Sequence, residues 1–177
     1  MLPTSCGDRP NNPPTSRLHV ASGADGYGIV ASEPIEAGDI LFPVNGTTTG
    51  RPTRYSIQVD ETTHIDVHPD TTRTEMRKLY PWRFLNHSCN PNAAYRSRAF
   101  VAVRRIAPGE PITYNYNTTE LDMAVPFDCA CGTDGCLGRI SGFIHLSGAE
   151  QERLRPWLTD YLRRRLDASL QAAAVCP

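Results

Sequence analysis

Three cysteines that lie close together are the clearest sign of a chemical site in this sequence. Cys129, Cys131 and Cys136 fall within eight residues, and the two glycines between them are suited to tight turns. Structural zinc takes four sulfur or nitrogen ligands in a tetrahedron, so this cluster needs a fourth ligand from elsewhere in the chain. Cys89 and His145 are candidates for that position. A disulfide or buried free thiols would account for the residue types, but neither explains the spacing, which favours zinc.

Asn86 and His87 form a second candidate group, within residues 83–92, which read RFLNHSCNPN. A lone histidine in a folded chain is more often a core residue whose ring nitrogens are hydrogen-bonded than a functional one. Here the histidine stands between two polar residues and precedes a Cys-x-Pro turn, which favours a binding role for His87.

Two tyrosines form the third group, in the segment 109–116, which reads GEPITYNY. Residues 112–116 alternate as a strand does, so Tyr114 and Tyr116 are expected to share one face. The alternative is that they are two half-buried tyrosines that only pack in a sheet. No acid or base with an evident catalytic position accompanies them in the sequence.

In this order, the NHSCxPN, GExxTYxY and CxCxxxxC motifs resemble the SET domain with its cysteine-rich post-SET tail. The resemblance extends from about residue 17 to about residue 143. Known members of that family transfer methyl groups from S-adenosylmethionine, mostly to protein lysines. The resemblance implies a mainly β SET fold, with small curved sheets, a pseudoknot-like crossing near residues 86–116, a zinc-bound post-SET tail and C-terminal helices.

The resemblance also implies roles for individual residues. Tyr116 matches the tyrosine that lines the methyl-transfer pore, and Tyr114 matches a position that affects how many methyl groups are added. Cys89 matches the cysteine that completes the zinc site, and Leu137 matches an apolar residue that packs on the adenine. The implied zinc ligands are Cys89, Cys129, Cys131 and Cys136. The implied cofactor-binding residues are Gly26, Tyr27, Gly28, Arg83, Asn86, His87 and Leu137. His145 is then expected to be hydrogen-bonded by a backbone group.

Departures from the family pattern concern the substrate. Asn115 replaces the acid of the common TYDY motif, and residues 41–46 lack the tyrosine and glutamate that chromatin-type members often have nearby. The insert that forms much of the substrate lip in SET proteins is very short in this chain.

The main hypothesis for the function is an S-adenosylmethionine-dependent protein-lysine N-methyltransferase. One alternative is a SET enzyme that acts on a small molecule in a biosynthetic pathway, and another is an inactive module that binds cofactor and zinc.

Composition is that of an ordinary globular domain, with 177 residues of which 40% are hydrophobic and 21% charged. A net charge of −1 argues against binding nucleic acid by charge alone, and no apolar run approaches the length of a membrane span. We therefore expect an intracellular protein whose partner is a protein lysine or a small molecule. In a reducing compartment, clustered cysteines more often bind metal than form disulfides.

The elements that hold these groups are expected in four regions. These are a flexible N-terminal arm at residues 1–16, the SET domain at 17–117, a post-SET zinc-binding segment at 118–145 and a helical extension at 146–177.

Local patterns predict several of the elements. Alternation over residues 55–59 predicts a half-buried strand. Ser147 and Glu150 form a capping-box pattern, and Pro156 predicts a break before a second helix.

Overall fold

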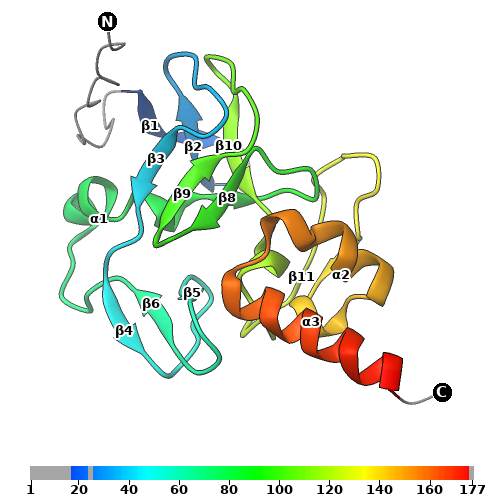
Figure 1. Ribbon diagram of the computed structural model, residues 1–177. Coiled ribbons are helices and arrows are strands. Elements are labelled where there is room, and N and C mark those ends of the chain that lie inside the picture. The colour runs from blue at the N-terminus through cyan, green and yellow to red at the C-terminus, as the bar shows by residue number, and fades with distance from the viewer. Residues whose placement is uncertain (1–16, 24–25, 176–177) are drawn as a thin grey trace, which may run out of the picture.

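Most elements of this chain are short β-strands gathered into small sheets (Figure 1). The computed structural model describes residues 17–23 and 26–175. The arm predicted at residues 1–16 lies outside the described residues. The mainly β fold with C-terminal helices that the sequence predicts is confirmed.

The first sheet brings the segment of Asn86 and His87 next to the segment of the two tyrosines. β1 (Leu18–Gly23) and β2 (Gly26–Ala31) form an antiparallel hairpin, and β10 (Pro111–Tyr114) pairs with β2. On its other edge β10 pairs in parallel with β7 (Asn86–His87). The order β1-β2-β10-β7 therefore places the Asn-His pair directly beside the strand that leads to the tyrosines.

Asn92 holds the chain where these two motifs cross. Its backbone N–H donates to the Thr113 carbonyl at 3.2 Å, and its side-chain oxygen accepts from the Thr113 N–H at 2.8 Å. Its amide nitrogen donates to the Pro111 carbonyl at 2.8 Å. Asn92 is 1% exposed, so these bonds satisfy a buried amide and fix the register of the crossing.

The remaining strands form three smaller sheets. In the second sheet the order is β3 (Ile40–Pro43), β9 (Ala99–Ala102), β8 (Ala93–Arg96). In the third it is β4 (Thr47–Thr49), β6 (His64–Asp66), β5 (Ile57–Gln58). The fourth pairs β11 (Phe127–Asp128) with β12 (Arg139–Ile140).

The prediction of a half-buried strand over residues 55–59 is wrong about the length of the strand. Only Ile57 and Gln58 pair, and both are buried. Gln58 can be buried because its amide donates to the carbonyls of Asp60 and Glu61, each at 3.0 Å, while its side-chain oxygen accepts from the Leu121 N–H at 2.8 Å. Hydrogen bonding of the glutamine overrides the alternating pattern.

Helices lie at the edges of the sheets. α1 (Arg73–Leu79) begins at a capping box formed by Thr72 and precedes the 3₁₀ turn η1 (Pro81–Phe84). After the strand β10 come η2 (Tyr116–Thr118) and η3 (Phe143–His145). The last helices are α2 (Gly148–Leu154), η4 (Arg155–Trp157) and α3 (Asp160–Val175).

The C-terminal helices follow the predicted pattern. Ser147 and Glu150 form the capping box, and Pro156 lies in η4, between α2 and α3. These helices pack together on the side of the molecule opposite α1 (Figure 1). The Tyr161 hydroxyl donates to the Thr119 carbonyl at 2.6 Å, so α3 helps to fix the segment that follows η2.

Two groups of buried apolar side chains stabilise this arrangement. The larger fills the space between the sheets and includes Ile29, Trp82 and Phe100. The smaller joins α2 and α3 to residues 121–146. Within residues 17–23 and 26–175, no helix has both the length and the apolar composition needed to cross a membrane.

Candidate active site and metal centre

Four cysteine thiols converge between the crossing and the chain after β11. The sulfur atoms of Cys89, Cys129, Cys131 and Cys136 all lie within 4.8 Å of one another, and none forms a disulfide. The Cys89 and Cys129 sulfurs are 4.0 Å apart. Bonds of about 2.3 Å to a tetrahedral zinc would place the sulfurs about 3.8 Å apart, so the four thiols fit such an ion with small adjustments.

The surrounding backbone places one N–H against a cysteine sulfur and supplies the turns between the cysteines. The Leu137 N–H points at the Cys89 sulfur at 3.4 Å, which favours a negative charge there. Gly132 and Gly135 have φ angles of +66° and +76°, a conformation that glycine adopts without strain, so the glycines between the cysteines form the predicted turns.

His145 takes no part in this cluster. Its Nε2 lies 2.9 Å from a carboxylate oxygen of Asp122. The expectation that a backbone group would hydrogen-bond this ring is therefore wrong, because the segment between η2 and β11 brings a side-chain acid to it.

His87 connects the thiol cluster to the tyrosines. Burial lowers its pKa to about 4, so the ring is neutral near pH 7. Its Nδ1 accepts from the Tyr116 N–H at 3.2 Å, which leaves the hydrogen on Nε2, 3.4 Å from the Cys89 sulfur. The ring packs edge-on against Tyr116 and Phe127, with centroid distances of 5.2 and 5.6 Å.

Asn86 lies against the glycine-rich start of β2. Its amide donates to the Tyr27 carbonyl at 3.2 Å, and a Cβ added at Gly28 would lie 3.0 Å from the same nitrogen. A side chain at Gly28 would thus displace Asn86. In the sequence, a glycine at this position is equally typical of a simple hairpin. In the structure, glycine is required there because a side chain would contact Asn86.

A cleft of about 1050 Å³ opens beside these residues. Its walls come from the start of β2, from α1 and η1, from β7 and from the segment leading through β11 to the cysteines. Arginines and aromatic rings dominate the lining, and the Arg77 guanidinium lies 4.7 Å from the centre of the Tyr27 ring. The lining residues that the sequence singled out are Gly26, Tyr27, Arg83, Asn86, His87, Tyr116, Cys129 and Cys131.

Two of the residues predicted to bind the cofactor do not line the cleft. Leu137 and Gly28 do not line the cleft, although Gly28 supports it through Asn86. Leu137 is half-buried beside the Cys89 sulfur. Its proposed contact with an adenine remains a prediction.

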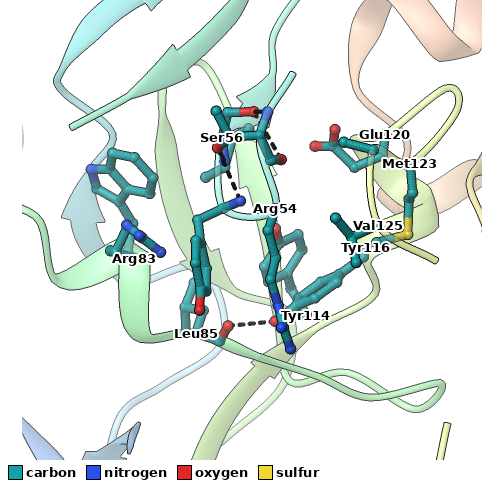
Figure 2. Close-up of a pocket in the computed structure, with 14 residues that line it drawn as sticks. Arg54, Ser56, Arg83, Leu85, Tyr114, Tyr116, Glu120, Met123 and Val125 are labelled. Carbon is teal, nitrogen blue, oxygen red and sulfur yellow. Dashed lines mark hydrogen bonds between the residues drawn. The ribbon is translucent and has the colours of Figure 1, made fainter. Parts of the chain in front are cut away.

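A second, much smaller cavity of about 30 Å³ adjoins the cleft, and the residues that line both are Arg54, Tyr55, Arg83, Leu85, Tyr116, Met123 and Val125. Figure 2 shows the two tyrosine rings adjacent at its edge, with a centroid distance of 4.7 Å. The strand carrying them ends at Tyr114, because Asn115 caps η2, in which Tyr116 is the first residue. The prediction of a strand through Tyr116 is therefore wrong, but both rings still reach the same cavity.

Both tyrosine hydroxyls are protonated near neutral pH. Burial raises the pKa of Tyr114 and of Tyr116 above the ordinary value. The Tyr116 hydroxyl donates to the Leu85 carbonyl at 2.7 Å (Figure 2), which fixes its hydrogen and leaves its oxygen lone pairs available at the junction of the two cavities.

Glu120 is a residue of the small cavity that the sequence did not single out. It is 6% exposed, and burial raises its pKa to about 7, against hydrogen bonds from the Gln58 N–H and the Thr119 hydroxyl that lower it. Figure 2 shows it on the side of the cavity beside Met123. The only sequence signal was an acid four residues after Tyr116, which is too common to be informative.

Comparison with known proteins now decides the family. Residues 26–117, about half of the chain, match the SET domain. The chain belongs to the SET-domain family. This SET-domain chain is 36% identical over 84 residues to Methyltransferase flvH of Aspergillus flavus, covering 45% of this chain and 46% of that protein. It is 30% identical over 152 residues to Histone-lysine N-methyltransferase ASHR3 of Arabidopsis thaliana, covering 77% of this chain and 30% of that protein.

A solved structure has a similar fold. The crystal structure of KRYPTONITE in complex with mCHH DNA, H3(1-15) peptide and SAH matches with a TM-score of 0.52 at 25% identity. The match covers 69% of this chain and 29% of that one. The SET-domain chain spans less than half the length of each of these relatives.

Proposed function

We propose that this SET-domain protein transfers methyl groups from S-adenosylmethionine to an amine, with a protein lysine as the first candidate substrate. The observation that carries this proposal is the pair of adjoining cavities, which share lining residues that include Tyr116 and Leu85. A methyl donor in the large cleft and an amine in the small one would approach each other beside these shared residues, as an in-line transfer requires.

The cleft residues suit such a cofactor. S-adenosylmethionine supplies an activated methyl group on a sulfonium centre. Asn86 and Tyr27 offer polar groups along β7 and β2, and the rings of His87 and Phe127 offer apolar faces. Arg83 has a buried Nε without a hydrogen-bond partner in the described residues, so it has a donor available for a carboxylate.

The tyrosines would orient the reacting groups. The neutral Tyr116 hydroxyl is held by Leu85, so its oxygen faces the junction of the cavities with a partial negative charge that suits a developing or transferring cationic centre. Tyr114 lies further into the small cavity wall and would limit the room around the amine nitrogen.

We propose one zinc ion on Cys89, Cys129, Cys131 and Cys136. Four thiolates leave no open position, so its role would be structural. It would tie the crossing to the segment of residues 123–131, which forms one wall of the cleft.

Binding of S-adenosylmethionine tests the cofactor part of the proposal. Isothermal titration of the zinc-containing protein is expected to show binding that Asn86→Ala largely removes. Asn90→Ala is the matched control, because Asn90 is an exposed asparagine of the same segment and lines neither cavity. Equal affinities in the two variants would place the cofactor elsewhere.

A small-molecule acceptor is the second candidate, supported by the short insert and by the absence from residues 41–46 of the tyrosine and glutamate that chromatin-type members often have nearby. Incubation of the protein with cell extract and radiolabelled cofactor separates the two. Label in a protein band supports a lysine substrate, and label in the low-molecular-weight fraction supports a small amine.

A further inference from the structure

The small cavity contains a carboxylate that is only partly hydrogen-bonded. Glu120 follows η2 and lines the cavity together with Tyr114 and Tyr116 (Figure 2). Its Oε1 accepts from the Gln58 N–H at 2.9 Å and from the Thr119 hydroxyl at 3.1 Å. In the part of the chain that the structure describes, Oε2 accepts no hydrogen bond.

No cation among the described residues neutralises this carboxylate. The nearest basic group is His64, whose Nε2 is 4.0 Å from Oε2, beyond hydrogen-bonding distance. Burial lowers the pKa of His64, so its ring is neutral near pH 7. Arg54 and Arg83 line the same cavity, Arg54 exposed and Arg83 half-buried, but among the described residues neither forms an ion pair with Glu120. A buried carboxylate without a paired cation is unfavourable, which is why its pKa is raised to about 7.

The tyrosines facing Glu120 are neutral as well. They are Tyr114 of β10, Tyr116 of η2 and Tyr161 of α3, and burial raises the pKa of each. The cavity therefore offers one acid and hydroxyl oxygens, and neither of its two arginines pairs with that acid. That combination fits a ligand which brings its own cation.

We propose that Glu120 binds the ammonium group of the substrate in this cavity and accepts a proton from it, so that the substrate class is a primary or secondary aliphatic amine. This inference rests on the proposed methyltransferase function. The volume of about 30 Å³ is that of about two water-sized spheres, so only the end of an unbranched chain fits. Leu85, Met123 and Val125 line the same cavity and give its methylenes an apolar wall.

The proton balance is simple. The N–H bond of R–NH₃⁺ breaks, its electron pair stays on nitrogen, and the proton forms an O–H bond with Glu120, which becomes a neutral acid. The resulting R–NH₂ has the lone pair that attack on a methyl group requires. Glu120 returns the proton to solvent after the product leaves. A group with pKa near 7 suits this exchange near neutral pH.

Ligand binding without turnover provides the test. n-Butylamine and n-butanol have the same chain length, but only the amine is charged near neutral pH. Their dissociation constants would be measured by NMR titration of the zinc-containing protein without cofactor, at pH 8. We expect the wild-type protein to prefer the amine by about tenfold or more, as a charge-assisted hydrogen bond predicts. Glu120→Gln should remove the preference and leave butanol binding unchanged.

Two further variants separate a binding role from a structural one. Glu120→Asp keeps the charge on a shorter side chain and should retain part of the preference. Glu33→Gln removes an exposed carboxylate outside both cavities and should retain all of it. In the wild-type protein the preference should also decrease as pH falls below about 7, because Glu120 becomes protonated.

The outcomes distinguish this inference from the proposed function. An equal preference in wild-type protein and Glu120→Gln, or no preference in the wild-type protein, overturns the role of Glu120. Titration with S-adenosylmethionine is run in parallel on the same samples. Absence of cofactor binding in the wild-type protein would overturn the methyltransferase proposal, whereas a Glu120-dependent amine preference would still support the amine site.

Discussion

Replacing Glu120 by glutamine should change how the stability of this protein depends on pH. Glutamine keeps the shape and the oxygen that accepts from Gln58 and Thr119, but it cannot ionise. Below pH 4.5 the glutamate is protonated in both the folded and the unfolded chain, so ionisation costs nothing. As pH rises, the unfolded chain releases this proton first, because the pKa of Glu120 in the folded protein is raised to about 7.

The size of the effect follows from the two pKa values. Between the ordinary value of 4.5 and about 7, wild-type stability should fall by about 1.4 kcal/mol per pH unit from this group alone. Over about 2.5 pH units the loss is about 3 kcal/mol, and it stays constant at higher pH. Glu120→Gln should therefore be close to the wild-type protein in stability at pH 4.5 and more stable by about 3 kcal/mol at pH 7.5.

Urea unfolding at pH 4.5, 6 and 7.5 measures this difference. Subtracting the two proteins at each pH cancels the contribution of the titrating groups that do not interact with Glu120, the cysteines included. Glu33→Gln controls for the loss of one negative charge at an exposed position. A stability difference between wild-type protein and Glu120→Gln that stays the same at all three pH values would refute the reasoning.

Three other changes test the remaining parts of the site. Metal analysis should find about one zinc per chain, and Cys136→Ser should lower the zinc content and weaken cofactor binding more than it unfolds the sheets. Gly28→Val should lower cofactor affinity at least tenfold in a calorimetric titration, because its side chain would displace Asn86. Tyr116→Phe should retain cofactor affinity but lower methyl transfer about a hundredfold in a radiolabel assay, because it removes the hydroxyl held by Leu85.

Each of these has a control or a contradicting outcome. Protein purified without chelator that contains no zinc would remove the metal assignment. Gly148→Val is the control for Gly28, since nothing lies within 4 Å of a Cβ added there. Tyr95→Phe controls for Tyr116, because Tyr95 is a buried tyrosine that lines neither cavity. Similar losses of methyl transfer in both tyrosine variants would mean that Tyr116 only packs.

The parts of the site that sequence could predict are those that depend on short spacing. Cys129, Cys131 and Cys136 lie on one loop, so their proximity is nearly certain from the sequence alone. The addition of Cys89 and the pairing of Asn86 with the tyrosine strand followed from the resemblance to the SET family, and the structure brings these residues together.

The parts that sequence could not predict depend on packing between distant elements. The raised pKa of Glu120 arises because Gln58, His64 and Tyr161, from β5, β6 and α3, exclude water from it. None of these contacts has a sequence pattern. The burial of Gln58 was missed for the same reason, since its partners lie in loops whose course the alternation of residues 55–59 does not indicate.

The large cleft has walls from four stretches of chain that are far apart in the sequence, from Gly26 in β2 to Cys131 after β11. A molecule that fills the cleft therefore binds only the folded chain. Its binding raises the free energy of unfolding of the whole protein. At a ligand concentration one hundred times the dissociation constant, this amounts to about 2.7 kcal/mol. Melting temperature can thus report on occupancy of the cleft without any knowledge of the reaction, so a collection of cofactor analogues and amines can be ranked by thermal shift before a methyl acceptor has been found.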